Sequence, residues 1–174
     1  MKKMIVLFSC LVLLQIISLP QAQASTTDDT WLQNRFTANP LGLLLGIGSF
    51  DYERALSEKF SLTISPSFIY FGWGEDDLYG GGVGLGGNYF ITGRAPKGLR
   101  VTADATPTYI ATDSDTNSLL FCSRAMIGYN WIWDSQFTLG LAGGIQYIYI
   151  TSSGVDSALK GLLPALSLNL GFAF

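Results

Sequence analysis

Apolar and small or polar side chains alternate along most of this chain with a period of two residues. In the clearest segment, residues 164–174, proline, leucine and phenylalanine fill the even positions, and alanine, serine, asparagine and glycine fill the odd ones. Because successive side chains of a β-strand point to opposite faces, this pattern predicts a strand with one apolar face. Six earlier segments repeat it less strictly: 49–55, 60–70, 79–91, 99–111, 119–133 and 137–149. No stretch has a clear period of 3.6 residues, so the sequence predicts an all-β fold.

The polar face of these segments carries few charges. Charged residues make up 13% of the chain, which is about half of the usual share. A face in contact with water would be rich in lysine and glutamate, yet only three lysines follow residue 24. The composition therefore favours an apolar face that contacts lipid and a small polar face that is enclosed. Aromatic residues near both ends of the segments fit two interfacial girdles: Tyr70, Trp73, Tyr79, Tyr109, Tyr147 and Tyr149 at one end, and Trp131, Trp133, Phe137, Phe172 and Phe174 at the other.

The connectors between the segments alternate in length. Those at 57–59, 93–98 and 134–135 are short, whereas those at 74–78, 112–118 and 151–161 are polar and mostly longer. This fits the short periplasmic turns and longer outer loops of outer-membrane barrels. The longer group is acidic, with Glu75, Asp76, Asp77, Asp113, Asp115 and Asp156.

An even number of strands closes a bacterial single-chain barrel, so a further strand must precede the seven segments. We place it within residues 32–45, with Asn39-Pro40 inside it and a tight bend near residues 46–48. The predicted fold is an eight-stranded antiparallel up-and-down transmembrane barrel.

The first 24 residues have the order of a secretory signal peptide. Two lysines precede an apolar run over residues 4–19, and two alanines occupy the −3 and −1 positions of a cleavage site that ends at Ala24. We expect cleavage after Ala24, which leaves residues 25–174 as one barrel domain in the outer membrane. The alternatives are a retained membrane helix, for which the run is slightly short and carries a glutamine, and lipoprotein processing at Cys10.

The mature chain has one cysteine, Cys122, so no disulfide can form within it. We expect this thiol to act as a small apolar filler. Loss of Lys2 and Lys3 lowers the net charge from −3 to −5, which makes the chain a poor candidate for binding nucleic acid.

A few charged residues fall on the face predicted to be enclosed. They are Asp51, Glu53, Arg100, Asp104 and Arg124. Inside a narrow barrel such groups must pair, because an unpaired buried charge costs several kcal/mol. We expect a structural set of ion pairs that fills the lumen in place of an open pore; the functional alternative is a gate or a proton-linked site.

The C-terminal nine residues, Leu-Ser-Leu-Asn-Leu-Gly-Phe-Ala-Phe, resemble the terminal signature of bacterial outer-membrane β-barrel proteins. The stretch from Asn39-Pro40-Leu41-Gly42 to Tyr52-Glu53 is similar to small barrels of the OmpA/OmpX-like type, whose function is uncharacterised. The resemblance covers about residues 31–174 and implies an eight-stranded outer-membrane barrel. It also implies recognition by the barrel-assembly machinery through an assembly signal formed by Phe174, Phe172, Leu170 and Leu168.

Three motifs that could carry chemistry each lack a required part. The chain has no histidine, which removes the commonest general base and metal ligand; the lipid A deacylases and palmitoyltransferases that share the barrel architecture rely on one. Residues 82–87 satisfy a dinucleotide-binding pattern, but a strand and not a helix is predicted to follow them. Residues 113–117 begin like a calcium loop, but Ser118 and Arg124 replace its glycine and its bidentate glutamate.

The sequence therefore predicts no cofactor, no metal site and no catalytic role. We expect a monomer in contact with outer-membrane lipid, with a structural role or a role in surface interaction through its acidic loops. Two rivals remain: an outer-membrane enzyme that acts on lipid with atypical chemistry, and a secreted, soluble lipid-carrying barrel.

Overall fold

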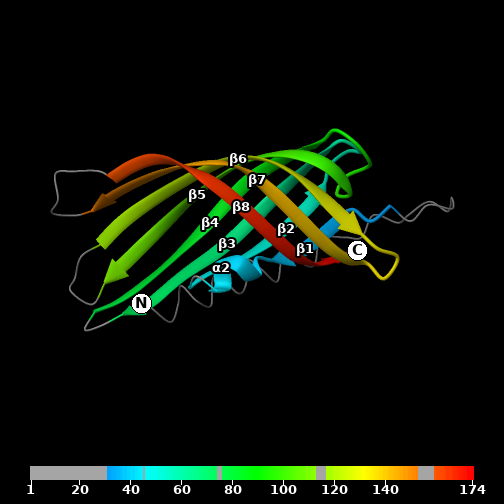
Figure 1. Ribbon diagram of the computed structural model, residues 1–174. Coiled ribbons are helices and arrows are strands. Elements are labelled where there is room, and N and C mark those ends of the chain that lie inside the picture. The colour runs from blue at the N-terminus through cyan, green and yellow to red at the C-terminus, as the bar shows by residue number, and fades with distance from the viewer. Residues whose placement is uncertain (1–30, 45, 74–75, 113–116, 153–158) are drawn as a thin grey trace. The chain divides into compact units, whose positions relative to one another are not determined.

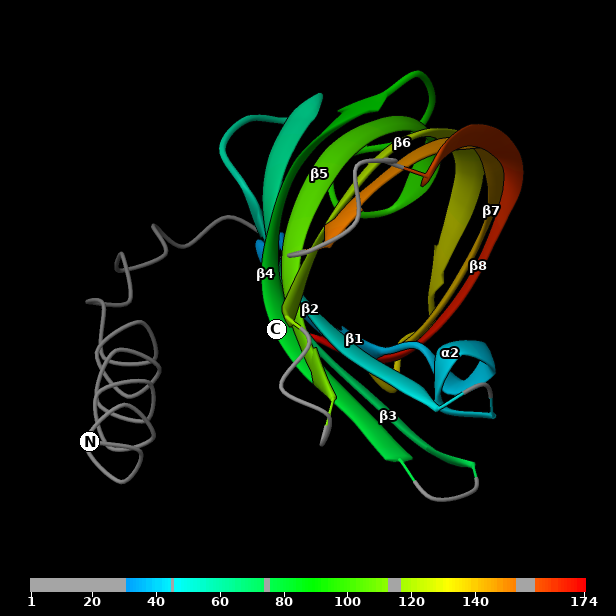
Figure 2. The same cartoon turned by 90° about the vertical axis from the view of Figure 1, so that its left-hand side faces the viewer.

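Eight antiparallel strands form a closed barrel in the computed structural model, which describes residues 31–44, 46–73, 76–112, 117–152 and 159–174 (Figure 1). The strands are β1 (Asn34–Ala38), β2 (Ile47–Ala55), β3 (Phe60–Trp73), β4 (Asp76–Phe90), β5 (Gly98–Thr112), β6 (Asn117–Ile132), β7 (Phe137–Ser152) and β8 (Leu159–Ala173). Each strand pairs with its neighbours in the sequence, and β1 pairs with β8 to close the ring, which Figure 2 shows end-on. This confirms the predicted all-β, eight-stranded, up-and-down barrel.

The first strand is shorter than predicted. It ends at Ala38, and a short helix, α2 (Pro40–Leu44), occupies the rest of the segment in which we expected strand. Proline cannot donate to a strand ladder, and its fixed φ suits the first position of a helix. The Asn39 side chain accepts a hydrogen bond from the Gly42 N–H at 3.1 Å, as a helix N-cap does. The expected bend follows at Gly46, which has a φ of 73°.

The turns at 56–59, 91–97 and 133–136 lie where short connectors were predicted, but all three outer connectors are shorter than expected, because only residues 74–75, 113–116 and 153–158 separate the strands. The first of these differs most in kind, because β4 begins at Asp76, inside the predicted loop 74–78. The acidic residues Glu75, Asp113, Asp115 and Asp156 lie outside the described residues, as does the predicted signal peptide, 1–24. Among the described residues, no helix is long and apolar enough to cross a membrane.

The two faces of the barrel wall have opposite character. Large apolar side chains point outward and are exposed, for example Leu166 at 82% and Leu85 at 63%. Polar and charged side chains point inward and are buried, for example Glu53 and Asn88, both at 0%. A protein that folds in water normally shows the reverse arrangement.

Exposed aromatic rings gather at both ends of the strands. One end carries Tyr70, Tyr79, Tyr109, Tyr147 and Tyr149, and the other carries Trp131, Trp133, Phe137, Phe172 and Phe174. At the second end the rings touch, with centroids 5.5 Å apart for Trp133 and Phe137 and 5.9 Å apart for Phe137 and Phe172. The side chain of Trp73 lies outside the described part.

Candidate functional site

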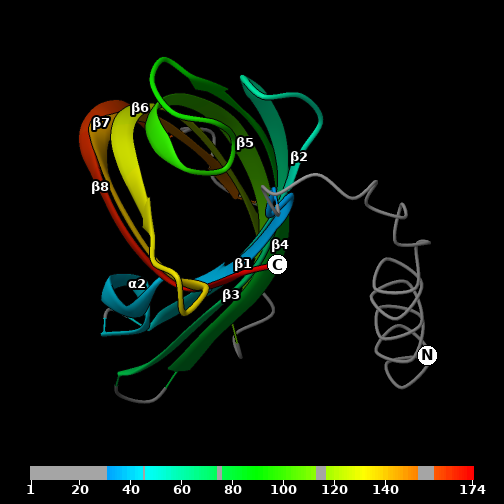
Figure 3. The ribbon, with the colours of Figure 1, turned by 90° about the vertical axis from the view of Figure 1, so that its right-hand side faces the viewer.

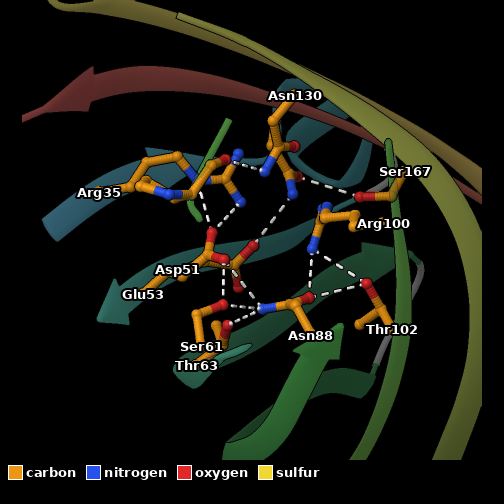
Figure 4. Close-up of polar contacts among 12 residues, drawn as sticks. Arg35, Asp51, Glu53, Ser61, Thr63, Asn88, Arg100, Thr102, Asn130 and Ser167 are labelled. Atoms are coloured by element: carbon orange, nitrogen blue, oxygen red, sulfur yellow. Dashed lines mark hydrogen bonds and ion pairs between the residues drawn. The ribbon is translucent and has the colours of Figure 1, made fainter. Parts of the chain in front are cut away.

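A network of hydrogen-bonded side chains fills one end of the barrel interior (Figure 4). We call it the polar network, and it consists of Arg35, Glu53, Ser61, Asn88, Arg100 and Thr102. These residues come from five consecutive strands, β1 to β5, and all lie on the inward face. The alternation of each strand places them there, because positions two residues apart share a face.

Glu53 is the most densely contacted member of the polar network. Its Oε2 accepts from Arg35 Nε at 2.7 Å and lies 2.6 Å from Arg35 Nη2. Its Oε1 accepts from the Ser61 hydroxyl and from Asn88 Nδ2, the latter at 3.0 Å. The carboxylate and guanidinium are 0% and 1% exposed, so both charges are held by protein groups alone.

Asn88 connects the acidic and basic parts of the polar network. Its amide nitrogen donates to Glu53, to the Ser61 hydroxyl and to Thr63 Oγ1 at 2.9 Å. Its carbonyl oxygen accepts from Arg100 Nη1 and from Thr102 Oγ1, the latter at 2.7 Å. The structure therefore links Glu53 to Arg100 through an amide rather than by a direct ion pair.

The other predicted lumen residues lie in a second group of contacts. Arg124 Nε donates to Asp104 Oδ1 at 2.8 Å, so the structure brings these two residues together as an ion pair. Asp51 accepts a hydrogen bond from Asn169 Nδ2 at 3.2 Å, and Asn169 accepts one from the Ser167 hydroxyl at 3.0 Å. Two carboxylates of the predicted set thus contact partners on β6 and β8.

Sequence reasoning missed Arg35 and Asn88. Arg35 lies in β1, where Arg35, Phe36 and Thr37 alternate over too few residues for the strand to be delimited. Asn88 was on the face predicted to be enclosed, but its lack of charge gave no reason to single it out. Its position directly opposite Ser61 and Thr102 could be recognised only from the register of β3, β4 and β5.

The turn between β4 and β5 closes the barrel beside the polar network. Ala95 and Pro96 are buried, although they lie in a connector. The Pro96 carbonyl accepts from Asn130 Nδ2 at 2.9 Å, and the Ala95 N–H donates to the Glu58 carbonyl at 2.8 Å. Phe90, at 0% exposure, packs at the same end. Side chains and the β4–β5 turn therefore close this end of the lumen.

A cavity of about 30 Å³ lies between the polar network and the Asp104–Arg124 pair. It has room for about two water molecules. Two buried donors in its lining residues, Arg35 Nη1 and Arg100 Nε, have no hydrogen-bond partner in the described part of the chain. The carboxylates of Asp51 and Asp104 also line the cavity, which therefore offers both donors and acceptors to a small polar group.

The structure also describes part of the other motifs that the sequence suggested. Residues 82–87 lie within β4, and no helix follows them. The Cys122 thiol is free, lies 3.8 Å from Gln146 Oε1 and is only partly buried. Residues 113–116 of the calcium-like segment lie outside the described part. The described residues contain no cluster of three or more acidic or cysteine side chains that could hold a metal ion.

The assembly signal expected at the C-terminus lies where β8 meets β1. Phe172 pairs with Phe36 and Leu170 with Ala38, and Phe174 exchanges two backbone hydrogen bonds of 2.8 Å with Asn34. Leu168 lies just beyond the end of β1. No known family model, curated protein or solved structure matches this chain.

Proposed function

We propose that residues 25–174 form an integral outer-membrane β-barrel of the OmpA/OmpX-like type, with a structural or surface-interaction role and no catalytic activity. The observation that carries the proposal is the inverted wall, which has leucines and aromatic rings outside and arginine, glutamate and asparagine inside. Soluble monomers rarely expose contiguous apolar patches larger than a few hundred Å², whereas lipid chains solvate such a surface well.

The inverted wall also argues against a soluble lipid carrier. Such a carrier turns its apolar side chains inward around the ligand and presents charge to water. Here the buried inward positions include Arg35, Glu53 and Arg100, and the exposed outward positions include Leu85 and Leu166.

An enzyme that acts on lipid would need a base to activate its serine, and the chain has no histidine to serve as one. The buried Ser61 hydroxyl donates a hydrogen bond to Glu53, and the charge of Glu53 is itself balanced by Arg35. Asp104 is likewise paired with Arg124. A serine without a free base is a weak nucleophile, so purified barrel is expected to leave lipid A unchanged.

An open diffusion pore also fits poorly with the interior. The polar network and the β4–β5 turn fill one end of the lumen, as expected when eight strands leave just enough room for side chains. Surface contact would then depend on the outer loops, whose acidic tips lie outside the described residues.

Labelling from within the bilayer tests the membrane location directly. In a Cys122→Ser background, Leu166→Cys and Ser167→Cys place a thiol on opposite faces of β8, at positions that are 82% and 7% exposed. A maleimide carried on a lipid chain is expected to modify Leu166→Cys and not Ser167→Cys in membranes. The folded barrel should also migrate differently on gels before and after boiling. Equal labelling at both positions, or full solubility without detergent, would overturn the proposal.

Phe174→Ser is expected to reduce the amount of folded barrel in the outer membrane severalfold, because Phe174 is the key residue of the proposed assembly signal. Its ring is 55% exposed and its paired groups are backbone atoms, so refolding of the purified variant in detergent should change little. Phe60→Ser, at another exposed phenylalanine (39%), is the control and should assemble normally. An equal loss in detergent would mean that Phe174 acts through stability and not through recognition.

A further inference from the structure

The exposed positive charges of the barrel are distributed unevenly between its two ends. Of the eight cations among the described residues, the three arginines of the cavity lining face inward and five lie outside the lumen. Four of these five lie at the end that carries the short turns, and we call them the basic rim: Arg54, Lys59, Arg94 and Lys97. The fifth, Lys160, lies at the opposite end, next to the acidic connectors. The whole chain, in contrast, has a net charge of −3.

Contacts between two turns hold the basic rim in place. The β2–β3 turn and the β4–β5 turn lie side by side at this end of the barrel (Figure 3). The Ala95 N–H donates to the Glu58 carbonyl at 2.8 Å, and Lys59 Nζ donates to the Gly93 carbonyl at 3.0 Å. Arg94 forms an ion pair with the Glu58 side chain at 3.2 Å. Because the two turns are connected in this way, their cations belong to one region of the surface.

The protein does not balance the positive charge of the basic rim. Glu58 is the one acidic residue in these two turns, and it pairs with Arg94. Among the described residues, Arg54, Lys59 and Lys97 form no ion pair. The two lysines and Arg94 are exposed, and Arg54 is half-buried, so a partner can reach all four. Four cations and one carboxylate leave a charge of +3 here, whereas carboxylates face the arginines in the cavity of the lumen. The basic rim therefore favours an anionic partner.

The outward apolar face of the barrel extends as far as the basic rim. By the alternation of β2, Arg54 points outward, and it lies directly opposite the exposed Leu62 on β3. Phe60 lies opposite Tyr89, and both rings are exposed, at 39% and 57%. Leu56, in the β2–β3 turn, is exposed as well. An amphiphile that lies along this face would contact apolar side chains with its chains and cations with its headgroup.

We propose that the basic rim binds the phosphate groups of anionic phospholipids in the periplasmic leaflet. The acyl chains lie along the outward apolar face, and the phosphate lies beside Arg54, Lys59 and Lys97. Long cationic side chains can reach such a phosphate while their stems contact apolar surface. A soluble anion or an acidic protein would use the charge of the basic rim but not the apolar face next to it, so the combination favours a lipid. This inference rests on the proposed membrane location.

Retention of lipid by the purified barrel measures this preference. The barrel is refolded in detergent with equal amounts of phosphatidylglycerol and phosphatidylcholine that carry the same acyl chains, and the lipids that stay bound are counted by native mass spectrometry. A cation near an anionic surface contributes about 1 kcal/mol, which is roughly fivefold, so three unpaired cations should favour phosphatidylglycerol by roughly tenfold or more. Salt at about 1 M, where the Debye length is about 3 Å, should remove the preference. Equal retention of the two lipids, or retention of neither, would overturn the inference, whereas the membrane location depends on the Leu166→Cys labelling described above.

Variants of the basic rim test which residues are responsible. Replacing Arg54, Lys59 and Lys97 together with glutamine should lower the preference for phosphatidylglycerol by roughly tenfold. Arg54→Lys combined with Lys59→Arg and Lys97→Arg keeps every charge and should keep the preference, which separates loss of charge from damage to the turns. Lys97→Gln and Lys160→Gln form a matched pair, because both lysines are exposed but lie at opposite ends of the barrel. Only Lys97→Gln should lower the preference, and equal effects of the two would contradict a site at the basic rim.

Soluble competitors distinguish a lipid from other anionic partners. Glycerophosphoglycerol has the same headgroup as phosphatidylglycerol but no acyl chains, so it should displace the lipid only at far higher concentrations than the lipid itself. Displacement at equal concentration would mean that the basic rim recognises a free phosphate ester. Displacement by an equal concentration of polyglutamate would mean that the basic rim binds an acidic protein. Either result would overturn the assignment to a phospholipid.

Discussion

Glu53→Ala is expected to destabilise the barrel by about 3–5 kcal/mol, the usual effect of removing one partner of a buried ion pair. The Arg35 guanidinium, which is 1% exposed, would keep its charge without a counter-ion. Ser61 and Asn88 would each lose an acceptor. Urea unfolding of the detergent-refolded barrel, followed by the gel shift between folded and unfolded forms, measures the change in the free energy of unfolding.

Glu58→Ala is the matched control for this prediction. Glu58 also pairs with an arginine, Arg94, at 3.2 Å, but its side chain is 66% exposed. An exposed pair contributes about 0–1 kcal/mol, so this variant should unfold nearly as the parent does. Replacing both Arg35 and Glu53 with leucine should recover part of the loss, because no unpaired charge is left inside. Equal losses for Glu53→Ala and Glu58→Ala would show that the polar network does not stabilise the barrel.

The strands could be predicted from the sequence because the signal for a barrel strand is local. Each segment of β2 to β8 shows its own alternation, and the short turns between them contain turn-forming residues. The outer ends of the strands were predicted less accurately. For example, β4 begins at Asp76, in a run that was predicted as a loop because of its acidic residues. Pairing with the next strand, and not composition, decides where such a strand ends.

The predicted length of the first strand was wrong for a related reason. The cap formed by Asn39 and the proline after it are helix signals, but five residues are too few for a helical period to appear. The shortness of β1 has a large structural consequence, because residues 159–169 of β8 then pair with β7 alone among the described strands. Apart from Pro164, no property of β8 itself indicates that one of its edges lacks a partner.

The members of the candidate site were easier to predict than their contacts. Asp51, Glu53, Arg100, Asp104 and Arg124 could be assigned to the inward face by alternation alone. Which of them meet depends on register: Arg35 lies directly opposite Glu53, and Asp104 lies directly opposite Arg124. Register follows from turn geometry and from the packing of both faces, which a single sequence does not display. The hub residue Asn88 is important only because it has charged neighbours on both sides.

Leu85→Arg is expected to destabilise the barrel by about 2–4 kcal/mol in lipid vesicles, the cost of an arginine near the midplane on the lipid face of an outer-membrane barrel. Leu85 lies on the outward face of β4, between the exposed rings of Tyr79 and Tyr89, and is 63% exposed. In a water-soluble protein, a charge at so exposed a position would change stability by about 0.5 kcal/mol or less. The free energy of unfolding in vesicles is the quantity to measure.

Leu56→Arg is the control variant for the Leu85→Arg prediction. Leu56 is exposed to a similar degree, 57%, but lies in the turn between β2 and β3, beyond the ends of both strands. Arginine there should reach water or lipid headgroups and change stability little. A large effect at Leu85 with a small one at Leu56 is expected only if hydrocarbon surrounds the middle of the strands. Small effects at both positions would mean that water contacts the whole outer surface, and the exposed leucines would then need a different partner.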